Sequence, residues 1–266
     1  MKVSEVMTTE YETVEKDQQL AKALNLMRKK KGITRLIVMH DKKPVGILSF
    51  RDVADKLGTY KTEGISPKEL YVASAMTTPI ISVEPNTDIK EAANIMFDKR
   101  ISSLLVMEGD VLKGLLRKFD LLKVYSSCKK IKVADLMTSN PMRITESERV
   151  ISARNTMVEK NISILPVVNE ENIVGIIDDE TLADALARFR EQIPIKHQKS
   201  RIQEFFVGQV MKTDPPTIFE YQPLCDAIIV FEKTMYKGVF VLDENKKLVG
   251  ILTLTDITKA IVEGKK

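Results

Sequence analysis

Four segments of the chain share one pattern of landmarks, and this repetition limits the fold more than any other feature of the sequence. Each copy opens on a methionine, has an apolar residue seven positions later, and has a glycine 38 or 39 positions after the methionine. The methionines are Met7, Met76, Met137 and Met211, and the glycines are Gly46, Gly114, Gly175 and Gly250. Self-similarity at a fixed period indicates a repeat architecture. We therefore expect four copies of one supersecondary unit.

Each copy predicts the same local structure, in the order strand, helix, β-hairpin, helix. In the first copy, apolar residues recur at helical spacing, which predicts an amphipathic helix. These residues are Leu20, Ala23, Leu24 and Met27. Two β-rich runs with a polar turn between them follow in RLIVMHDKKPVGIL, and DVADKL is the closing helix. A unit of about 60 residues leaves one sheet face uncovered, so we expect the units to pair.

The composition argues against several classes of protein. The chain has 266 residues, with 41 Lys and Arg against 37 Asp and Glu, so its basic surplus is too small to favour nucleic acid. Its start, MKVSEVMTTE, lacks the apolar core of a signal peptide, and its apolar runs are too short to cross a membrane. The two histidines are isolated, and Cys128 and Cys225 lack metal-type spacing. We expect a cytoplasmic protein with buried free thiols, no metal site and no catalytic residue.

The polar links between the units predict how they pair. Residues 58–71 separate the first two units and residues 190–205 the last two, whereas only SSCKKIK lies between the second and third. We therefore expect the first unit to pair with the second, and the third with the fourth. The predicted modules are 1–127, with units at about 1–57 and 70–127, and 128–266, with units at about 131–190 and 205–266.

The repeated order of Met-Thr, strand, amphipathic helix, LPVV-type hairpin, Gly-Ile-x-[Ser/Thr]-x-x-Asp and helix resembles the CBS domain. This resemblance implies an α+β fold of four βαββα-type units paired into two Bateman modules. The layout is similar to that of the gamma subunit of AMP-activated protein kinase. It further implies a regulatory protein, not an enzyme, that binds an adenosine-containing ligand such as AMP, ADP or ATP between paired units. We expect an intrachain disc or a homodimer, and an effector protein in trans.

The first and fourth units hold the residues best suited to such a ligand. Asp52 follows a strand and opens a helix, so its carboxylate can accept two hydrogen bonds from a ribose diol. Ser49 offers a hydroxyl three residues earlier, and Thr253 with Asp256 repeats this pair. Asp52 alone is equally consistent with a helix cap. Because the pair decays in two sibling units while the glycine persists, we interpret the pair as optional for the fold and as ligand-binding.

The second and third units depart from this pattern. The second keeps Asp120 but has Arg117 in place of the hydroxyl, and the third has Asp178 and Thr181 in place of the hydroxyl and the carboxylate. Three acids in a row in the third unit would repel a phosphate. The sequence therefore predicts two competent clefts, one in each module, with Asp120 as an additional candidate residue.

By the resemblance, the partner unit completes each cleft. The segment 101–104 would face Ser49 and Asp52, and 162–165 would face Thr253 and Asp256, with a small hydroxyl and an apolar residue suiting an adenine. The candidates for these walls are Ser102, Ser163, Ile101, Ile162, Ile47, Ile251, Ile81 and Met142. The resemblance also places Arg35 at a phosphate-contacting position and Lys237 at that of a neighbouring histidine. Arg51 flanks Asp52 and could also reach a phosphate. Core packing for the apolar residues, and solvation for Arg51, are the alternatives.

Three other hypotheses stay open. S-adenosylmethionine offers the same adenosine to Asp52 without requiring Arg35. A nucleic-acid-binding or scaffold protein is supported only by the slight basic surplus. A catalytic function lacks support, because the sequence has no nucleophile–base pair, metal cluster or phosphate-binding loop.

Overall fold

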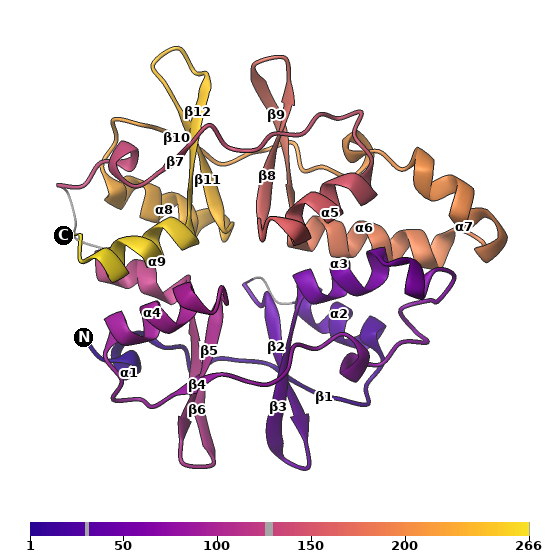
Figure 1. The fold of residues 1–266 in the computed structure, drawn as a ribbon, viewed down its shortest axis with the longest axis horizontal. Coiled ribbons are helices and arrows are strands. Elements are labelled where there is room, and N and C mark those ends of the chain that lie inside the picture. The colour runs from indigo at the N-terminus through magenta and orange to yellow at the C-terminus, as the bar shows by residue number, and fades with distance from the viewer. Residues whose placement is uncertain (30–31, 126–129, 266) are drawn as a thin grey trace.

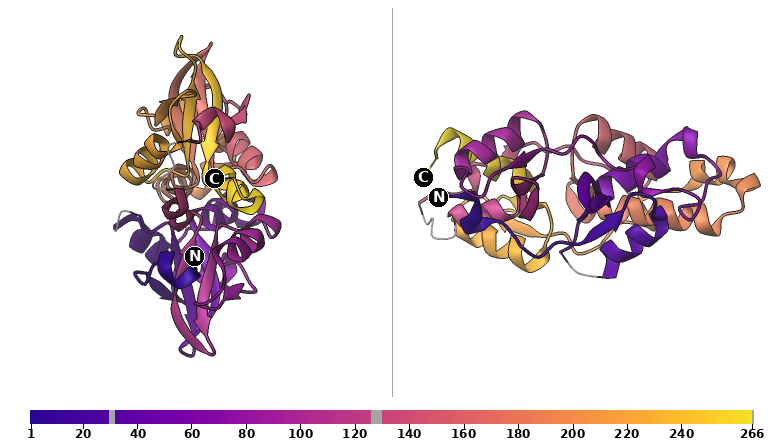
Figure 2. Two further views of the ribbon diagram at one scale, coloured as in Figure 1. Left: turned by 90° about the vertical axis from the view of Figure 1, so that its left-hand side faces the viewer. Right: turned by 90° about the horizontal axis from the view of Figure 1, so that it is seen from below.

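A computed structural model of the chain describes residues 1–29, 32–125 and 130–265, which form a flat disc (Figures 1 and 2). The first two units make one half of the disc and the last two make the other. Cys128 and the predicted module boundary at 127/128 lie outside the described residues, so that boundary stays a prediction. Among the residues described, no helix is both long enough and apolar enough to cross a membrane.

Each unit forms the elements that its pattern predicts, with small differences in length. The first unit contains α1 (Val3–Val6), β1 (Thr13–Glu15), α2 (Leu20–Lys29), β2 (Arg35–His40), β3 (Lys43–Ser49) and α3 (Phe50–Gly58). The second contains β4 (Ser82–Val83), α4 (Ile89–Asp98), β5 (Ser103–Glu108), β6 (Val111–Arg117) and the 3-10 helix η3 (Asp120–Tyr125). The third contains β7 (Thr138–Ser139), α5 (Val150–Glu159), β8 (Ile164–Asn169), β9 (Asn172–Asp178) and α6 (Asp179–Gln192). After the linking helix α7 (Ile195–Arg201), the fourth contains β10 (Thr217–Phe219), α8 (Leu224–Thr234), β11 (Gly238–Leu242), β12 (Leu248–Thr253) and α9 (Leu254–Glu263).

The predicted α+β fold is confirmed, and its sheets share one order. In the first unit β1 lies parallel to β2, and β2 pairs antiparallel with β3. The second unit repeats this order with β4, β5 and β6, and the fourth with β10, β11 and β12. In the third, the expected first strand is reduced to one bridge between Ile144 and Val167. The expected helix DLLKVY is a 3-10 helix.

The glycine and methionine landmarks meet across paired units. A Cβ atom added to Gly46 would lie 2.9 Å from Met76 Sδ, and one added to Gly114 would lie 3.1 Å from Met7 Sδ. Gly250 meets Met137 and Gly175 meets Met211 in the same way. The residue after each methionine also exchanges backbone hydrogen bonds with the partner unit; Thr77, for example, pairs with Ile47. The glycine of each unit therefore packs against the methionine of its paired unit, and this contact is reciprocal within each pair.

We expect Gly114→Ala to destabilise the protein by about 1–3 kcal/mol, the usual cost of overpacking. The added Cβ would lie 2.7 Å from the carbonyl oxygen of Thr8, which cannot move without breaking its hydrogen bond to Leu115. Urea unfolding of the variant measures the effect. Val111→Ala, at an exposed position of the same strand, is the control and should change stability by less than about 0.5 kcal/mol. Equal stability of the two variants would contradict this packing account.

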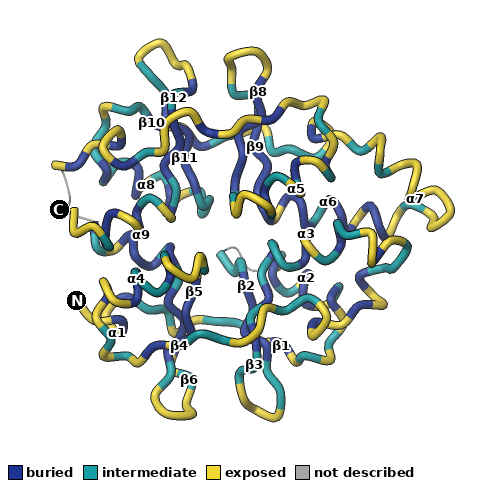
Figure 3. The backbone as a smooth tube through the Cα atoms, in the orientation of Figure 1, coloured by how far each residue is buried: buried dark blue, intermediate teal, exposed yellow. Residues whose placement is uncertain are grey.

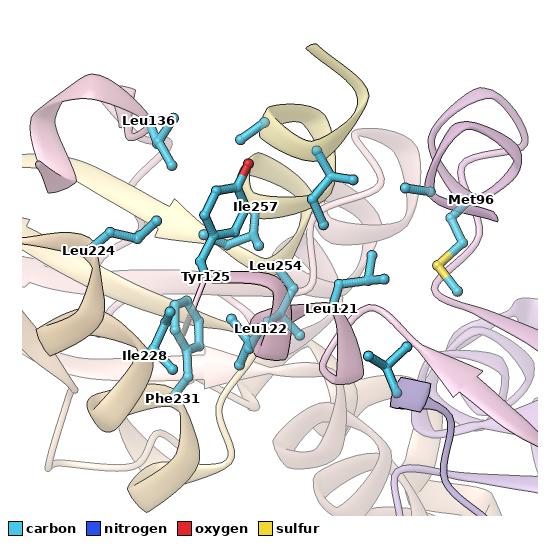
Figure 4. Packing of buried hydrophobic residues seen from close by; sticks show 14 of the residues in the cluster. Met96, Leu121, Leu122, Tyr125, Leu136, Leu224, Ile228, Phe231, Leu254 and Ile257 are labelled. Atoms are coloured by element: carbon cyan, nitrogen blue, oxygen red, sulfur yellow. The ribbon is translucent and has the colours of Figure 1, made fainter. Parts of the chain in front are cut away.

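The large hydrophobic cores connect the two halves of the disc. One core joins the second and fourth units, where Leu121, Leu122 and Tyr125 from η3 pack with residues of α8 and α9 such as Phe231 and Ile257 (Figure 4). A second core joins α3 of the first unit to α6 of the third. The buried positions run along these facing helices, whereas the hairpin tips project outward and are exposed (Figure 3). The halves are therefore held together mainly by helix packing.

Candidate functional site

A cavity of about 560 Å³ lies where the four units meet, and it collects fifteen of the sixteen predicted site residues. They are Ser49, Asp52, Thr253, Asp256, Arg35, Ile47, Ile251, Ser102, Ser163, Ile101, Ile162, Ile81, Met142, Lys237 and Arg51. The sequence predicts two separate clefts, whereas the structure brings both sets of residues into this shared cavity. The difference arises because the inner edges of both halves face each other across the helix interface.

In the first unit, Ser49 and Asp52 form a capping box at the start of α3. The Asp52 carboxylate accepts hydrogen bonds from the Ser49 backbone N–H at 2.7 Å and from its hydroxyl at 2.6 Å, both at Oδ2. Thr77 Oγ1, from the second unit, donates to the other oxygen at 2.8 Å. Burial raises the pKa of Asp52, and the nearby Asp179 adds to that rise. This carboxylate is thus fixed in position at the edge of the cavity.

The fourth unit reproduces this geometry almost unchanged. Asp256 Oδ2 accepts from the Thr253 backbone N–H at 2.7 Å and from its hydroxyl at 2.6 Å. Thr138 Oγ1 donates to Oδ1 at 2.9 Å. A carboxylate has about four acceptor positions, so three internal donors leave about one for a ligand. In this geometry Asp52 has room for about one ribose hydrogen bond, and the predicted contact with both ribose hydroxyls stays a prediction.

Asp120 is the predicted site residue that the structure does not bring to the cavity. Arg117 holds its carboxylate through two guanidinium contacts, from Nη2 at 2.7 Å and from Nε at 3.0 Å. In the third unit, Thr181 and Lys212 occupy the Asp178 carboxylate, and the Lys212 Nζ distance is 3.1 Å. In the second and third units a cationic side chain therefore contacts the carboxylate. In the first and fourth units a threonine hydroxyl makes the corresponding contact.

One buried carboxylate neutralises two of the predicted cations. Asp179 accepts from Arg51 Nε at 3.1 Å and from Lys237 Nζ at 2.6 Å, and its side chain is 5% exposed. Arg51 also donates to the Ile162 carbonyl at 2.5 Å and to Ser163 Oγ at 2.9 Å. The guanidinium of Arg51 is therefore engaged by protein groups, although its side chain is 24% exposed. It connects α3 of the first unit to the third unit.

Two buried cations at the cavity lack such a partner. Among the residues that the structure describes, neither Arg35 nor Lys118 has a carboxylate within 4.0 Å, although each residue is only 8% exposed. Arg35 donates from Nη1 to the Ser102 carbonyl at 2.7 Å, while its Nε has no partner in the described part of the chain. Lys118 donates to Thr255 Oγ1 at 3.1 Å. Burial lowers the pKa of Arg35 to about 10 and that of Lys118 to about 8. Repulsion from Arg117 adds to the first shift, and repulsion from Arg35 and Arg51 adds to the second.

The overall charge of the lining is positive. Among the described residues, six cationic side chains line the cavity against three acidic ones. The cations are Arg35, Arg51, Arg100, Arg117, Lys118 and Lys237, and the acids are Asp52, Asp179 and Asp256. Buried charges without a counterion are costly, so an anion placed near Arg35 and Lys118 would relieve both desolvation and repulsion. The site thus combines two carboxylates at its edges with an unneutralised cationic centre.

We expect the binding of an anion at this centre to weaken as the pH rises from 7 to 9, because Lys118 loses its charge near pH 8. Since its pKa is lowered on folding, the ligand-free protein should also gain stability from pH 8 upward. Titration calorimetry with AMP at each pH measures the first effect and thermal unfolding measures the second. The Lys118→Met variant should lose both dependences. A pH profile that the variant retains would assign them to another group.

Sequence reasoning missed three residues of the site. Thr77 and Thr138 each follow a methionine landmark, and this shared position was a signal within the repeat. Asp179 was read only as a repulsive acid, because its partners Arg51 and Lys237 lie in other units. Such partners emerge only from the tertiary arrangement.

A model of the CBS domain matches residues 3–59, 72–127, 133–190 and 207–263. The chain therefore belongs to the CBS-domain family. It is 26% identical over 274 residues to the uncharacterised protein MJ1225 of Methanocaldococcus jannaschii, covering 93% of this chain and 94% of that one. The crystal structure of MJ1225, described as a proposed archaeal homologue of g-AMPK, superposes with a TM-score of 0.83 over 97% of this chain and 99% of that one, at 24% identity.

Two further comparisons show where such units occur. An uncharacterised conserved protein from Pyrococcus horikoshii has a TM-score of 0.64 at 18% identity, over 98% of this chain and 100% of that one. A homoserine O-acetyltransferase of Methanococcoides burtonii is 32% identical over 114 residues, which are 42% of this chain and 23% of the enzyme. Several other curated relatives are matched over half of their length or less. CBS units thus occur both as whole chains and as parts of enzymes.

Proposed function

We propose that this chain is a non-catalytic regulatory protein that binds an adenine nucleotide, AMP, ADP or ATP, in the central cavity. Asp52 and Asp256 each accept one hydrogen bond from a ribose hydroxyl. Ile47, Ile81 and Ile101 flank the adenine of the first subsite, and Ile251, Met142 and Ile162 flank that of the second. Arg35 and Lys118 bind the phosphate between the two subsites.

The observation that carries this proposal is a pair of buried cations without a carboxylate partner among the described residues, in one cavity with two matching hydroxyl–carboxylate pairs. A protein that used Ser49 and Asp52 only as a helix cap would have no need of Arg35 buried at 8% exposure with an unbonded Nε. Buried polar groups normally have partners, and an anionic ligand supplies one here. The apolar residues beside the carboxylates suit an aromatic base.

Binding is proposed to act on a partner protein through the relative position of the two halves. The cavity lies at their interface, and a ligand that contacts both halves shifts their equilibrium by its differential affinity for the two arrangements. We propose that the response passes to an effector in trans, and that the modules of this response are 1–127 and 128–266.

Titration calorimetry of the intact protein with AMP, ADP and ATP tests the function. We expect binding of at least one of them in the micromolar range or tighter, and we expect uridine monophosphate as a control to bind at least tenfold more weakly. Absence of binding by all three adenine nucleotides, with the protein folded by circular dichroism, would refute the proposal.

A further inference from the structure

The linking helix α7 projects from the end of the disc that lies opposite both chain termini (Figure 1). The fold can connect two units without such a helix. Residues 59–71 make the corresponding connection between the first two units with a short 3-10 turn, Tyr60–Thr62. An isolated helix of seven residues is marginal at best in water, so contacts with the rest of the protein must hold α7 in place.

One buried side chain anchors α7 to both halves of the disc. The Gln198 amide donates to the carbonyl oxygens of Arg190 at 3.2 Å and Ile193 at 2.8 Å, at the end of α6, and it accepts from Arg190 Nη1 at 2.7 Å. Arg190 Nη2 in turn donates to the carbonyl oxygen of Leu57, 3.2 Å away near the end of α3. The position of α7 is thus fixed in advance, which lowers the entropic cost of binding a partner there.

The outward side of α7 combines apolar and cationic side chains. Tyr60, from the first half of the disc, is 81% exposed, and Ile195, from the second half, is 68% exposed. Ile195 reaches the segment that follows Tyr60, since its Cγ2 would lie 3.2 Å from a Cβ added to Gly64. Lys196 and Lys199 are exposed on α7 beside Ile195. Exposed apolar side chains bordered by polar ones are typical of protein interaction sites.

The two lysines keep their charge available for a partner. Among the described residues, neither Lys196 nor Lys199 has a carboxylate within 4.0 Å, and α7 itself contains no acidic residue. Of the acids near this end of the disc, Glu204 pairs with Arg201 at 3.3 Å, and Glu63 favours the charged form of the buried Arg190. The local charge that remains uncompensated is therefore positive.

We propose that this surface docks an acidic segment of the effector protein, in which carboxylates flank an apolar side chain. The surface, which we name the α7 rim, consists of Tyr60, Ile195, Lys196 and Lys199. This inference rests on the proposed function, because that function acts through an effector in trans. The lysines select the charge of the segment, and the two apolar side chains supply contact area that both halves of the disc contribute.

The helices that hold α7 also begin at the central cavity. Asp52 lies in the first turn of α3, Asp179 begins α6, and Arg51 Nε joins the two helices by donating to Asp179 at 3.1 Å. The far ends of the same helices meet at Arg190, next to α7. A ligand that moves α3 against α6 at the cavity therefore also moves the two parts of the α7 rim. By linkage, the cavity and the rim change each other's affinity by the same factor.

Fluorescence anisotropy with a labelled random copolymer of glutamate and tyrosine tests the docking surface. We expect the natural chain to bind it in the micromolar range, and Lys196→Glu with Lys199→Glu to weaken binding by about tenfold or more. Lys22→Glu with Lys233→Glu, at exposed positions of α2 and α8, makes the same change of net charge and should leave the affinity unchanged. If the charge-reversed variant fails to fold, Lys196→Gln with Lys199→Gln replaces it. Ile195→Ser should also weaken binding.

The outcomes separate the α7 rim from the proposed function. The docking surface would be overturned by absence of copolymer binding, by equal weakening in the control pair, or by equal or tighter binding of polyuridylate, which indicates an RNA partner. Saturating AMP should change the copolymer affinity by about fivefold or more, and an unchanged affinity in a chain that binds AMP would overturn the coupling. A chain that binds no AMP but docks the copolymer through Lys196 and Lys199 would refute the proposed function and leave the docking surface standing.

Discussion

Asp179→Ala is expected to destabilise the protein by about 3–5 kcal/mol, the usual cost of leaving a buried charge without its partner. The substitution abandons Arg51 and Lys237 next to two cations, Arg35 and Lys118, that have no carboxylate partner within the described part of the chain. For a chain of this length, such a loss lowers the melting temperature by about 6–20 °C. Calorimetric unfolding of both proteins measures the change.

The same substitution should increase the affinity for AMP by about tenfold or more, because it removes the acid that neutralises the centre. Millimolar AMP should then restore much of the lost melting temperature. Asp184→Ala, five residues further along α6, is the control, since Asp184 pairs with Arg28 and Arg188 while 25% exposed. It should cost about 1 kcal/mol and leave AMP affinity unchanged. A destabilised Asp179→Ala protein without any gain in affinity would show that this carboxylate stabilises the fold but does not limit AMP binding.

Much of the fold could be predicted because its determinants are local and occur four times. The apolar stripe of α2 is buried as its spacing predicts, and the hairpins form where a polar turn separates two β-rich runs. The cavity-lining residues were also predictable. Each lies at a fixed offset from a landmark, and the landmark sets the end of a strand or the start of a helix.

The exchange of segments between units was not predictable from this periodicity. The turn at Val3–Val6 packs in the core of the second and fourth units, and Val72 packs in that of the first and third. The N-terminal turn of each unit therefore belongs physically to its neighbour. Repetition in the sequence defines equivalent residues, but it does not say which copies touch.

The residues proposed to bind the ligand also cap the closing helices. Ser49 with Asp52 and Thr253 with Asp256 form capping boxes, and Asp178 caps α6 by accepting from Thr181. Arg117 keeps the backbone bond from its N–H to Asp120 at 2.7 Å. A polar contact across this turn is thus preserved in every unit, although the hydroxyl–carboxylate pair itself occurs only in the first and fourth. The units differ in the side chain that donates a hydrogen bond to the second oxygen of this carboxylate.

Arg35→Met is expected to weaken AMP binding by about 10- to 100-fold, since charge-assisted hydrogen bonds are each worth about 1.5–3 kcal/mol. Binding of S-adenosylmethionine, which has no phosphate, should stay within about threefold of the natural protein. Parallel calorimetric titrations with the two ligands therefore separate the leading proposal from its main alternative. If the variant loses affinity for both ligands equally, Arg35 serves the adenosine or the shape of the cavity.

Stability provides the control for this variant. Burial lowers the pKa of Arg35 to about 10, and its Nε is unbonded, so its charge is a cost to the ligand-free protein. Methionine keeps much of the buried volume without that charge, and we expect Arg35→Met to unfold at an equal or higher temperature than the natural protein. Arg188→Met, at a side chain 67% exposed, should alter neither property. Loss of AMP affinity together with retained or increased stability is the pattern of a residue kept for its ligand, because a structural arginine would lose stability first.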